Sequence, residues 1–109
     1  MSDSGVAWPG GEGAPVSAAA ARSLAASLQA LAEPARLRIL SIVSANDPRP
    51  TTVTELVDAV GLSQATVSHH LKHLLQAGFV SAERAGNWNL YRANADAYAD
   101  VVQRLSPNR

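Results

Sequence analysis

The sequence contains no cysteine. Disulfide bonds, thiolate metal sites and thiol redox sensing are therefore excluded by chemistry. No apolar run approaches the roughly 18 residues of a membrane span, and the first residues lack the basic and then apolar pattern of a secretory signal. These absences predict a soluble protein of the cytoplasm without a membrane partner. Catalytic motifs are missing as well: there is no HExxH pair, no glycine-rich phosphate loop and no nucleophile beside a base, so we expect no enzyme.

The 109 residues carry no net charge, but their charges are unevenly distributed. With 47% hydrophobic residues, the chain is long enough for one domain with a modest core. Between Val60 and Asn94 the cations Lys72, Arg84 and Arg92 oppose Glu83 alone, and all three histidines lie in the same window. The local field is therefore mildly positive, as a nucleic-acid partner would require.

The most informative stretch runs from Thr54 to Val80 and reads TELVDAVGLSQATVSHHLKHLLQAGFV. Two helical patterns meet at Gly61, and Ser63 is a good cap for the second helix. On a helical wheel this second helix has one apolar face, formed by Val67, Leu71, Leu74, Leu75 and Gly78. Its opposite face is polar and free of acidic residues, and carries Thr66, His69, Lys72, His73 and Gln76. This pattern is typical of a helix-turn-helix whose second helix faces a phosphate-lined groove.

The remaining chain predicts a small mixed domain around this motif. Residues 1–15 are rich in Gly, Pro and Ser and are expected to form a disordered arm, in which Trp8 either stays unplaced or docks on the domain. Residues 16–106 form the domain, and 107–109 form a tail. Helices are predicted over 15–32, from Pro34 to about 45, from a Thr54 cap to 60, and from Asn94 or Asp96 to about 106.

The period changes after the second helix of the motif. Residues 79–84 and 88–93 are short extended runs around Ala85-Gly86-Asn87, and Gly-Asn is a hairpin-turn pair. A hairpin after a helix-turn-helix is a wing. The sequence therefore predicts a mainly α (α+β) winged helix-turn-helix with the order helix, helix, helix, helix, strand, strand, helix.

Three segments of the chain resemble the ArsR/SmtB family of winged-helix repressors. They read PARLRIL, ELVDAVGLSQATVSHHLKHLLQAGFV and ERAGNWNLYR, and the match spans about Leu28 to Asp100. The resemblance implies a homodimer that blocks transcription at double-stranded operator DNA and releases it when a metal or another inducer binds.

The first and last helices are the elements left free to build such a dimer. The leucine stripe of the first helix suits either the core of one chain or a seam between two chains. The candidate interface residues are Leu24, Leu28, Leu31, Tyr98, Val101 and Leu105.

A recognition helix enters the major groove with its N-terminus first. The residues at the start of the second helix are therefore the predicted DNA contacts. Ser63, Gln64 and Thr66 are expected nearest to the bases or phosphates, and Ser68 and His69 come next. Gln64 is the best base reader because its amide can bond adenine N6 and N7 together, although it could also be a solvated surface residue. The further candidates are Lys72 for a phosphate, Arg84 and Asn87 at the wing tip, and His70 as a structural histidine satisfied by backbone.

Metal sensing departs from the family pattern. The resemblance implies ligands near the start and further along the last helix, but here the start reads Asp96-Ala97-Tyr98 and no His or acidic residue follows Asp100. Asp96 and Asp100 could hold a cation weakly, although two solvated carboxylates are favoured. His69 and His73 have the i, i+4 spacing of zinc or nickel ligands, but they lie on the DNA face.

Nickel or zinc is thus the best candidate effector, at a weak site of nitrogen and oxygen ligands. A co-regulator protein that carries the sensor is the alternative, as is a winged helix that binds protein in place of DNA. The polar face of the second helix has no acidic residue and carries Gln64 as a candidate base contact, so DNA is favoured over protein as its partner.

Overall fold

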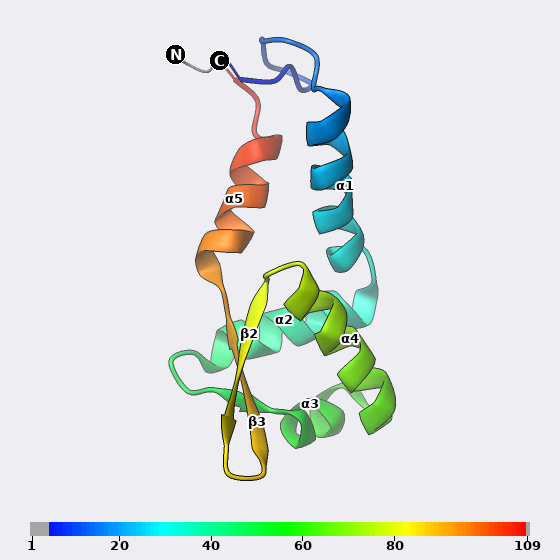
Figure 1. The fold of residues 1–109 in the computed structure, drawn as a ribbon, viewed down its shortest axis with the longest axis vertical. Helices are drawn as coiled ribbons and strands as arrows, with labels where there is room; N and C mark the ends of the chain where they lie inside the picture. The colour runs from blue at the N-terminus through cyan, green and yellow to red at the C-terminus, as the bar shows by residue number, and fades with distance from the viewer. Residues whose placement is uncertain (1–4, 109) are drawn as a thin grey trace.

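The computed structural model describes residues 5–108. Five helices and three short strands follow one another in the order α1 (Ala18–Leu31), α2 (Pro34–Asn46), β1 (Thr51–Thr52), α3 (Val53–Val60), α4 (Gln64–Gln76), β2 (Val80–Ala85), β3 (Trp88–Ala93) and α5 (Ala95–Leu105). The predicted winged helix-turn-helix is confirmed, with α3 and α4 as its two helices and β2–β3 as its wing (Figure 1). None of the helices in this part of the chain combines the length and hydropathy that a bilayer crossing requires.

The sheet has a third strand that the sequence did not predict. Its antiparallel order is β1-β3-β2, and Thr51 and Thr52 pair with Tyr91 and Leu90 of β3. Thr51 is fully buried, and its hydroxyl accepts a hydrogen bond from the Asn46 amide at 2.8 Å. A strand of two residues is too short to show an alternating pattern, and its partner lies far along the chain, so only the tertiary structure reveals it.

The cap of α3 also differs from the predicted one. Thr52, not Thr54, accepts the hydrogen bond from the Glu55 amide (3.2 Å), and the Glu55 carboxylate accepts one from the Thr52 amide (3.1 Å). This reciprocal pair is a capping box. The Thr52 amide first, and then the Arg49 guanidinium at 2.8 Å, hold the pKa of Glu55 below its ordinary value of 4.5. Gly61 ends the helix at a positive φ of 71°, which confirms the predicted turn.

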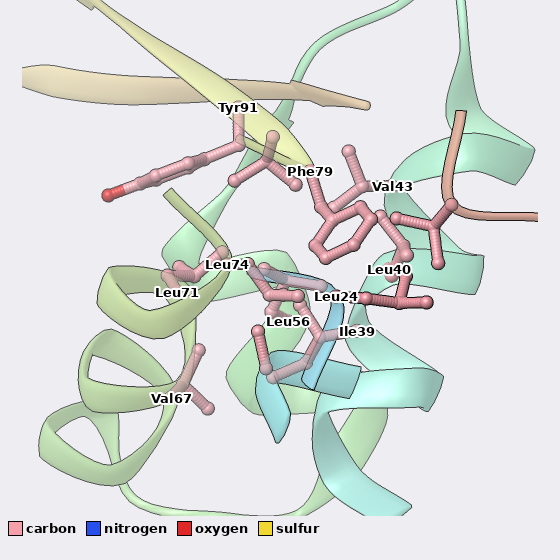
Figure 2. Packing of buried hydrophobic residues seen from close by; sticks show 13 residues of the cluster. Leu24, Ile39, Leu40, Val43, Leu56, Val67, Leu71, Leu74, Phe79 and Tyr91 are labelled. Atoms are coloured by element: carbon pink, nitrogen blue, oxygen red, sulfur yellow. The ribbon is translucent and has the colours of Figure 1, made fainter. Parts of the chain in front are cut away.

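One hydrophobic core joins the helix-turn-helix to α2 and the sheet. Its fully buried side chains converge from α2, α3, α4 and the segment that leads into β2 (Figure 2). The largest of them are Phe79, Ile39, Leu56, Leu71, Leu74, Val43 and Val67. Burial of Val67, Leu71 and Leu74 confirms the predicted inner face of α4, so the opposite face must look outward.

Helices α1 and α5 lie side by side and extend away from this core (Figure 1). The chain measures 48 × 23 × 21 Å, and its radius of gyration is 16.2 Å. A compact chain of this length would have a radius of gyration of about 13 Å. The two helices therefore form a thin projection that exposes much of its own surface.

The segment before α1 differs from the expected disordered arm where the structure describes it. The Trp8 indole N–H donates to the Arg104 carbonyl at 2.7 Å, and the Glu12 amide donates to the Asn108 carbonyl at 2.9 Å. Arg104 belongs to the last turn of α5, whose carbonyls lack partners within the helix, and the indole satisfies one of them. Residues 1–4 of the predicted arm and Arg109 of the predicted tail lie outside the described residues.

The capping box generates a stability prediction with a matched control in the same helix. We expect Thr52→Ala to lower the free energy of unfolding by about 1 kcal/mol, because it leaves the Glu55 amide without its partner. Thr54→Ala removes an exposed threonine without a capping role and should change the free energy by less than about 0.5 kcal/mol. Urea unfolding followed by circular dichroism measures both, and equal losses would contradict the assignment of the cap.

Candidate nucleic-acid interface

The N-terminus of α4 is capped by the hydroxyl of one serine, Ser63, which also bonds the hydroxyl of one threonine, Thr66. Ser63 Oγ accepts a hydrogen bond from the Thr66 amide at 3.1 Å and donates to Thr66 Oγ1 at 2.9 Å. The predicted cap is therefore confirmed. Because Thr66 Oγ1 accepts the Ser63 proton, its own hydroxyl proton remains available to a group outside the helix.

The outer face of α4 brings the predicted contact residues together. Gln64, at the first position of the helix, is exposed, and its amide makes no hydrogen bond within residues 5–108. Its donor and acceptor are thus free to meet a base edge. The other predicted contacts of this face are exposed too, namely Ser63, Thr66, Ser68, His69 and Lys72.

His70 is a structural histidine, as predicted, but its partners are side chains and not the backbone. The side chain lies with the core residues of α4, and Nδ1 is 3.2 Å from Arg36 Nη1. A guanidinium can only donate, so Nδ1 accepts and the ring proton sits on Nε2, 3.8 Å from Glu33 Oε1. The sequence offered no signal for this contact, since Arg36 and His70 belong to different helices.

Arg36 extends this contact to the end of α1. Its Nε donates to the Ala30 carbonyl at 2.8 Å, and Nη2 donates to the Gln29 carbonyl at 3.3 Å. One side chain of α2 thus links the C-terminal carbonyls of α1 to the recognition helix.

His69 and His73 approach each other on the surface of α4. Their Nε2 atoms are 3.2 Å apart, so one nitrogen donates and the other accepts. Desolvation first, and then the positive charge of Arg36 and the neighbouring histidines and Lys72, lower the pKa of His73. The neutral form, which is the metal-binding form, is therefore favoured. Within residues 5–108, however, no group of three or more His, Cys, Asp or Glu side chains could hold a metal ion together.

The last helix does not fit the metal site that the family resemblance implies. Asp96 and Asp100 are exposed, and Asp100 Oδ2 lies 3.8 Å from Arg104 Nη1 on the next turn. No histidine occurs in α5. The two carboxylates are therefore solvated, and one of them is partly neutralised by an arginine.

The wing tip and the N-terminus of α4 lie at the same end of the molecule, far from the chain termini (Figure 1). Arg84 and Asn87 are both exposed there. Arg84 Nε donates to the Gly86 carbonyl at 3.1 Å, which folds the guanidinium over the turn. Both predicted wing contacts are thus exposed to solvent.

The predicted dimer residues divide into two groups. Leu24 and Val101 are buried within one chain, and Leu31 and Leu105 are partly buried against its core. Leu28 and Tyr98 are exposed. Two further exposed apolar residues, Leu37 (51%) and Val102 (50%), were missed by the sequence reasoning, although Val102 follows Tyr98 at helical spacing.

Comparison with known proteins agrees with this geometry. Residues 33–82 match the sequence model of the arsR family of bacterial regulatory proteins. The transcriptional regulator NmtR of Mycobacterium tuberculosis is 45% identical over 78 residues, which cover 72% of this chain and 62% of NmtR. An HTH-type regulator of Methanocaldococcus jannaschii is 33% identical over 69% of this chain and 82% of its own length.

Solved structures show the same fold. The homodimeric winged helix-turn-helix domain Mb0332 of Mycobacterium bovis, a possible ArsR-family regulator, superposes with a TM-score of 0.67 at 29% identity. The superposition covers 79% of this chain and 78% of that one. The fold and the exposed face of α4 define a DNA-binding winged helix-turn-helix protein. The chain belongs to the ArsR family of transcription regulators, which are not enzymes.

From the His69–His73 pair and the solvated Asp96 and Asp100 we predict how the protein binds metal ions. Calorimetric titration with nickel or zinc should show only weak binding, since two imidazoles leave the coordination shell open. That binding should disappear in His69→Ala with His73→Ala and change little in Asp96→Ala with Asp100→Ala. A nanomolar site that survives loss of the histidines and requires Asp96 would contradict this prediction.

Proposed function

We propose that the protein is a dimeric repressor that reads a specific operator sequence with α4 and holds the flanking backbone with the wing. The observation that carries this proposal is the outer face of α4, where exposed polar side chains occur without any acidic residue from Ser63 to Gly78. Such a face can approach phosphates without charge repulsion and can donate to and accept from base edges.

The proposed contacts follow from the position of each side chain. Gln64 is exposed and unpaired at the tip of the helix, so it pairs with a base, and adenine matches its amide. Thr66 and Ser68 add short hydroxyl contacts nearby. Lys72 lies further along the helix and neutralises a phosphate, as does Arg84 from the wing, while Ser63, His69 and Asn87 line the same surface.

The proposed dimer uses α1 and α5. Two recognition helices that read successive major grooves must be spaced by about 34 Å, and a symmetric dimer supplies that spacing. The thin projection of α1 and α5 and the exposed Leu28, Tyr98 and Val102 support an apolar interface there. The M. bovis domain with the same fold is homodimeric, which supports the same assembly here.

The proposed effector is a nickel or zinc ion bound weakly by nitrogen and oxygen ligands. The side chains available are His69, His73, Asp96 and Asp100, and the histidine pair has the better geometry. Since this pair lies on the DNA face, a bound ion would compete with the operator. If the chain alone shows no response to metal, the sensor belongs to a co-regulator protein.

The base-reading role of Gln64 has a matched control in Gln76, an exposed glutamine at the other end of α4. Gln64→Ala should weaken binding to a selected operator duplex by about 1 to 3 kcal/mol and hardly affect random DNA, whereas Gln76→Ala should affect neither. Lys72→Ala should weaken both and flatten the salt dependence, because a phosphate contact carries no sequence information. Fluorescence anisotropy measures these affinities, and equal losses of Gln64→Ala on both duplexes would reject the base-reading role.

The dimer proposal is tested by placing one charge on the exposed apolar surface of α1 or α5. Leu28→Glu and Tyr98→Glu should yield monomers that no longer bind the operator, because an unpaired carboxylate would be buried in the interface. Gln103→Glu puts the same charge on another exposed side of α5 and should stay dimeric. Light scattering at micromolar concentration reports the mass, and a monomeric wild-type protein would refute the proposed assembly.

A further inference from the structure

The wing exposes a large aromatic side chain that no role yet explains. Every residue from Ser81 to Asn89 is exposed, so this end of the hairpin projects beyond the rest of the chain. Trp88 lies at its tip and is 58% exposed, more than any other large hydrophobic residue among the described ones. The other tryptophan, Trp8, is only partly exposed and is hydrogen-bonded to α5 at the opposite end of the molecule.

The strand register explains why the chain itself cannot cover Trp88. The last pair of the β2–β3 ladder joins Ala85 to Trp88, and alanine is too small to shield an indole. Side chains alternate along β3, so Trp88 lies on the face opposite to Tyr91, which is buried against the core. The backbone ladder therefore holds the indole at the tip of the wing while its surface remains open to a partner.

The position of the wing tip favours duplex DNA as the partner that covers Trp88. The tip lies at the same end of the molecule as the N-terminus of α4 (Figure 1). When α4 occupies a major groove, the adjacent backbone and minor groove run past this end. On the face of the hairpin that carries the indole, the register places Ala85, Leu90 and Glu83, and the Glu83 carboxylate is paired with Arg92 at 3.5 Å. The opposite face of the tip carries Arg84 and Asn89, both exposed, so a cation and an amide flank the indole across the hairpin and suit DNA.

We propose that Trp88 inserts the edge of its indole into the minor groove next to the α4 site. The ring packs against deoxyribose and base edges, and its N–H is a donor for the N3 and O2 acceptors of A·T pairs on the groove floor. Because the contact depends on groove width, Trp88 adds selectivity at base pairs that α4 does not touch. This inference rests on the proposed operator recognition by α4 and adds the wing as a second element that contacts bases.

Fluorescence isolates Trp88 because the chain has only two tryptophans. In Trp8→Phe, all indole emission comes from Trp88, and adding a duplex selected by the wild-type protein from a random library should shift and quench that emission. Trp88→Ala should weaken binding to the same duplex about tenfold, within the range of aromatic contacts to nucleotides, and Trp88→Phe should recover part of the loss. Trp8→Phe should bind as the wild type does.

A chemically modified duplex tests whether Trp88 contacts the minor groove. Replacing adenine by 2,6-diaminopurine at the flanking A·T pairs adds an amino group to the minor groove and leaves the N6 and N7 groups of the major groove unchanged. The modification should weaken binding of the wild type and have little further effect on Trp88→Ala. Unchanged emission, wild-type affinity of Trp88→Ala, or equal losses of both proteins on the modified duplex would each overturn the inference. Lys72→Ala, measured in parallel, shows whether α4 still binds DNA in that case.

Discussion

The structure depends on how α4 divides its surface between the core and solvent. Val67, Leu71 and Leu74 are buried against α2 and α3, and this burial holds the helix at a fixed orientation. The same constraint directs His69 and Lys72 outward, since they lie on the side of the helix opposite to Val67. Gln64 is exposed because it occupies the first position of α4, before the buried stretch begins. Removing this burial would therefore destroy the binding face as well as the core, so stability and DNA recognition share one set of contacts.

The contact between Arg36 and His70 connects that helix to the proposed dimer elements. Arg36 bonds the last carbonyls of α1 and one ring nitrogen of a histidine in α4. A guanidinium forms these directional bonds at fixed angles, so Arg36 fixes the end of α1 relative to the recognition helix. The two proposed functions of the chain, pairing with a second copy and reading DNA, are thus joined by a side chain of α2.

The two ends of the molecule are chemically different. The end formed by the start of α4 and the wing is polar, with exposed hydroxyls, amides and the single indole of Trp88. The projection of α1 and α5 carries exposed Leu28, Tyr98 and Val102. Apolar surface favours a partner that removes it from water, and polar surface favours a hydrated groove. A repressor that pairs through one end and binds DNA through the other accounts for both.

Local patterns in the sequence were sufficient for the helix-turn-helix, the Ser63 cap, the Gly61 turn and the inner face of α4, because helical periodicity and capping act within a few residues. They were insufficient for β1, whose two residues are a strand only through pairing with β3, and for the Thr52 cap beside it. Tertiary structure alone decided that Arg36 satisfies His70, that Trp8 meets α5, and that Leu24 and Val101 are buried while Val102 is exposed. Each of these depends on contacts between segments distant in the chain, which no local pattern encodes.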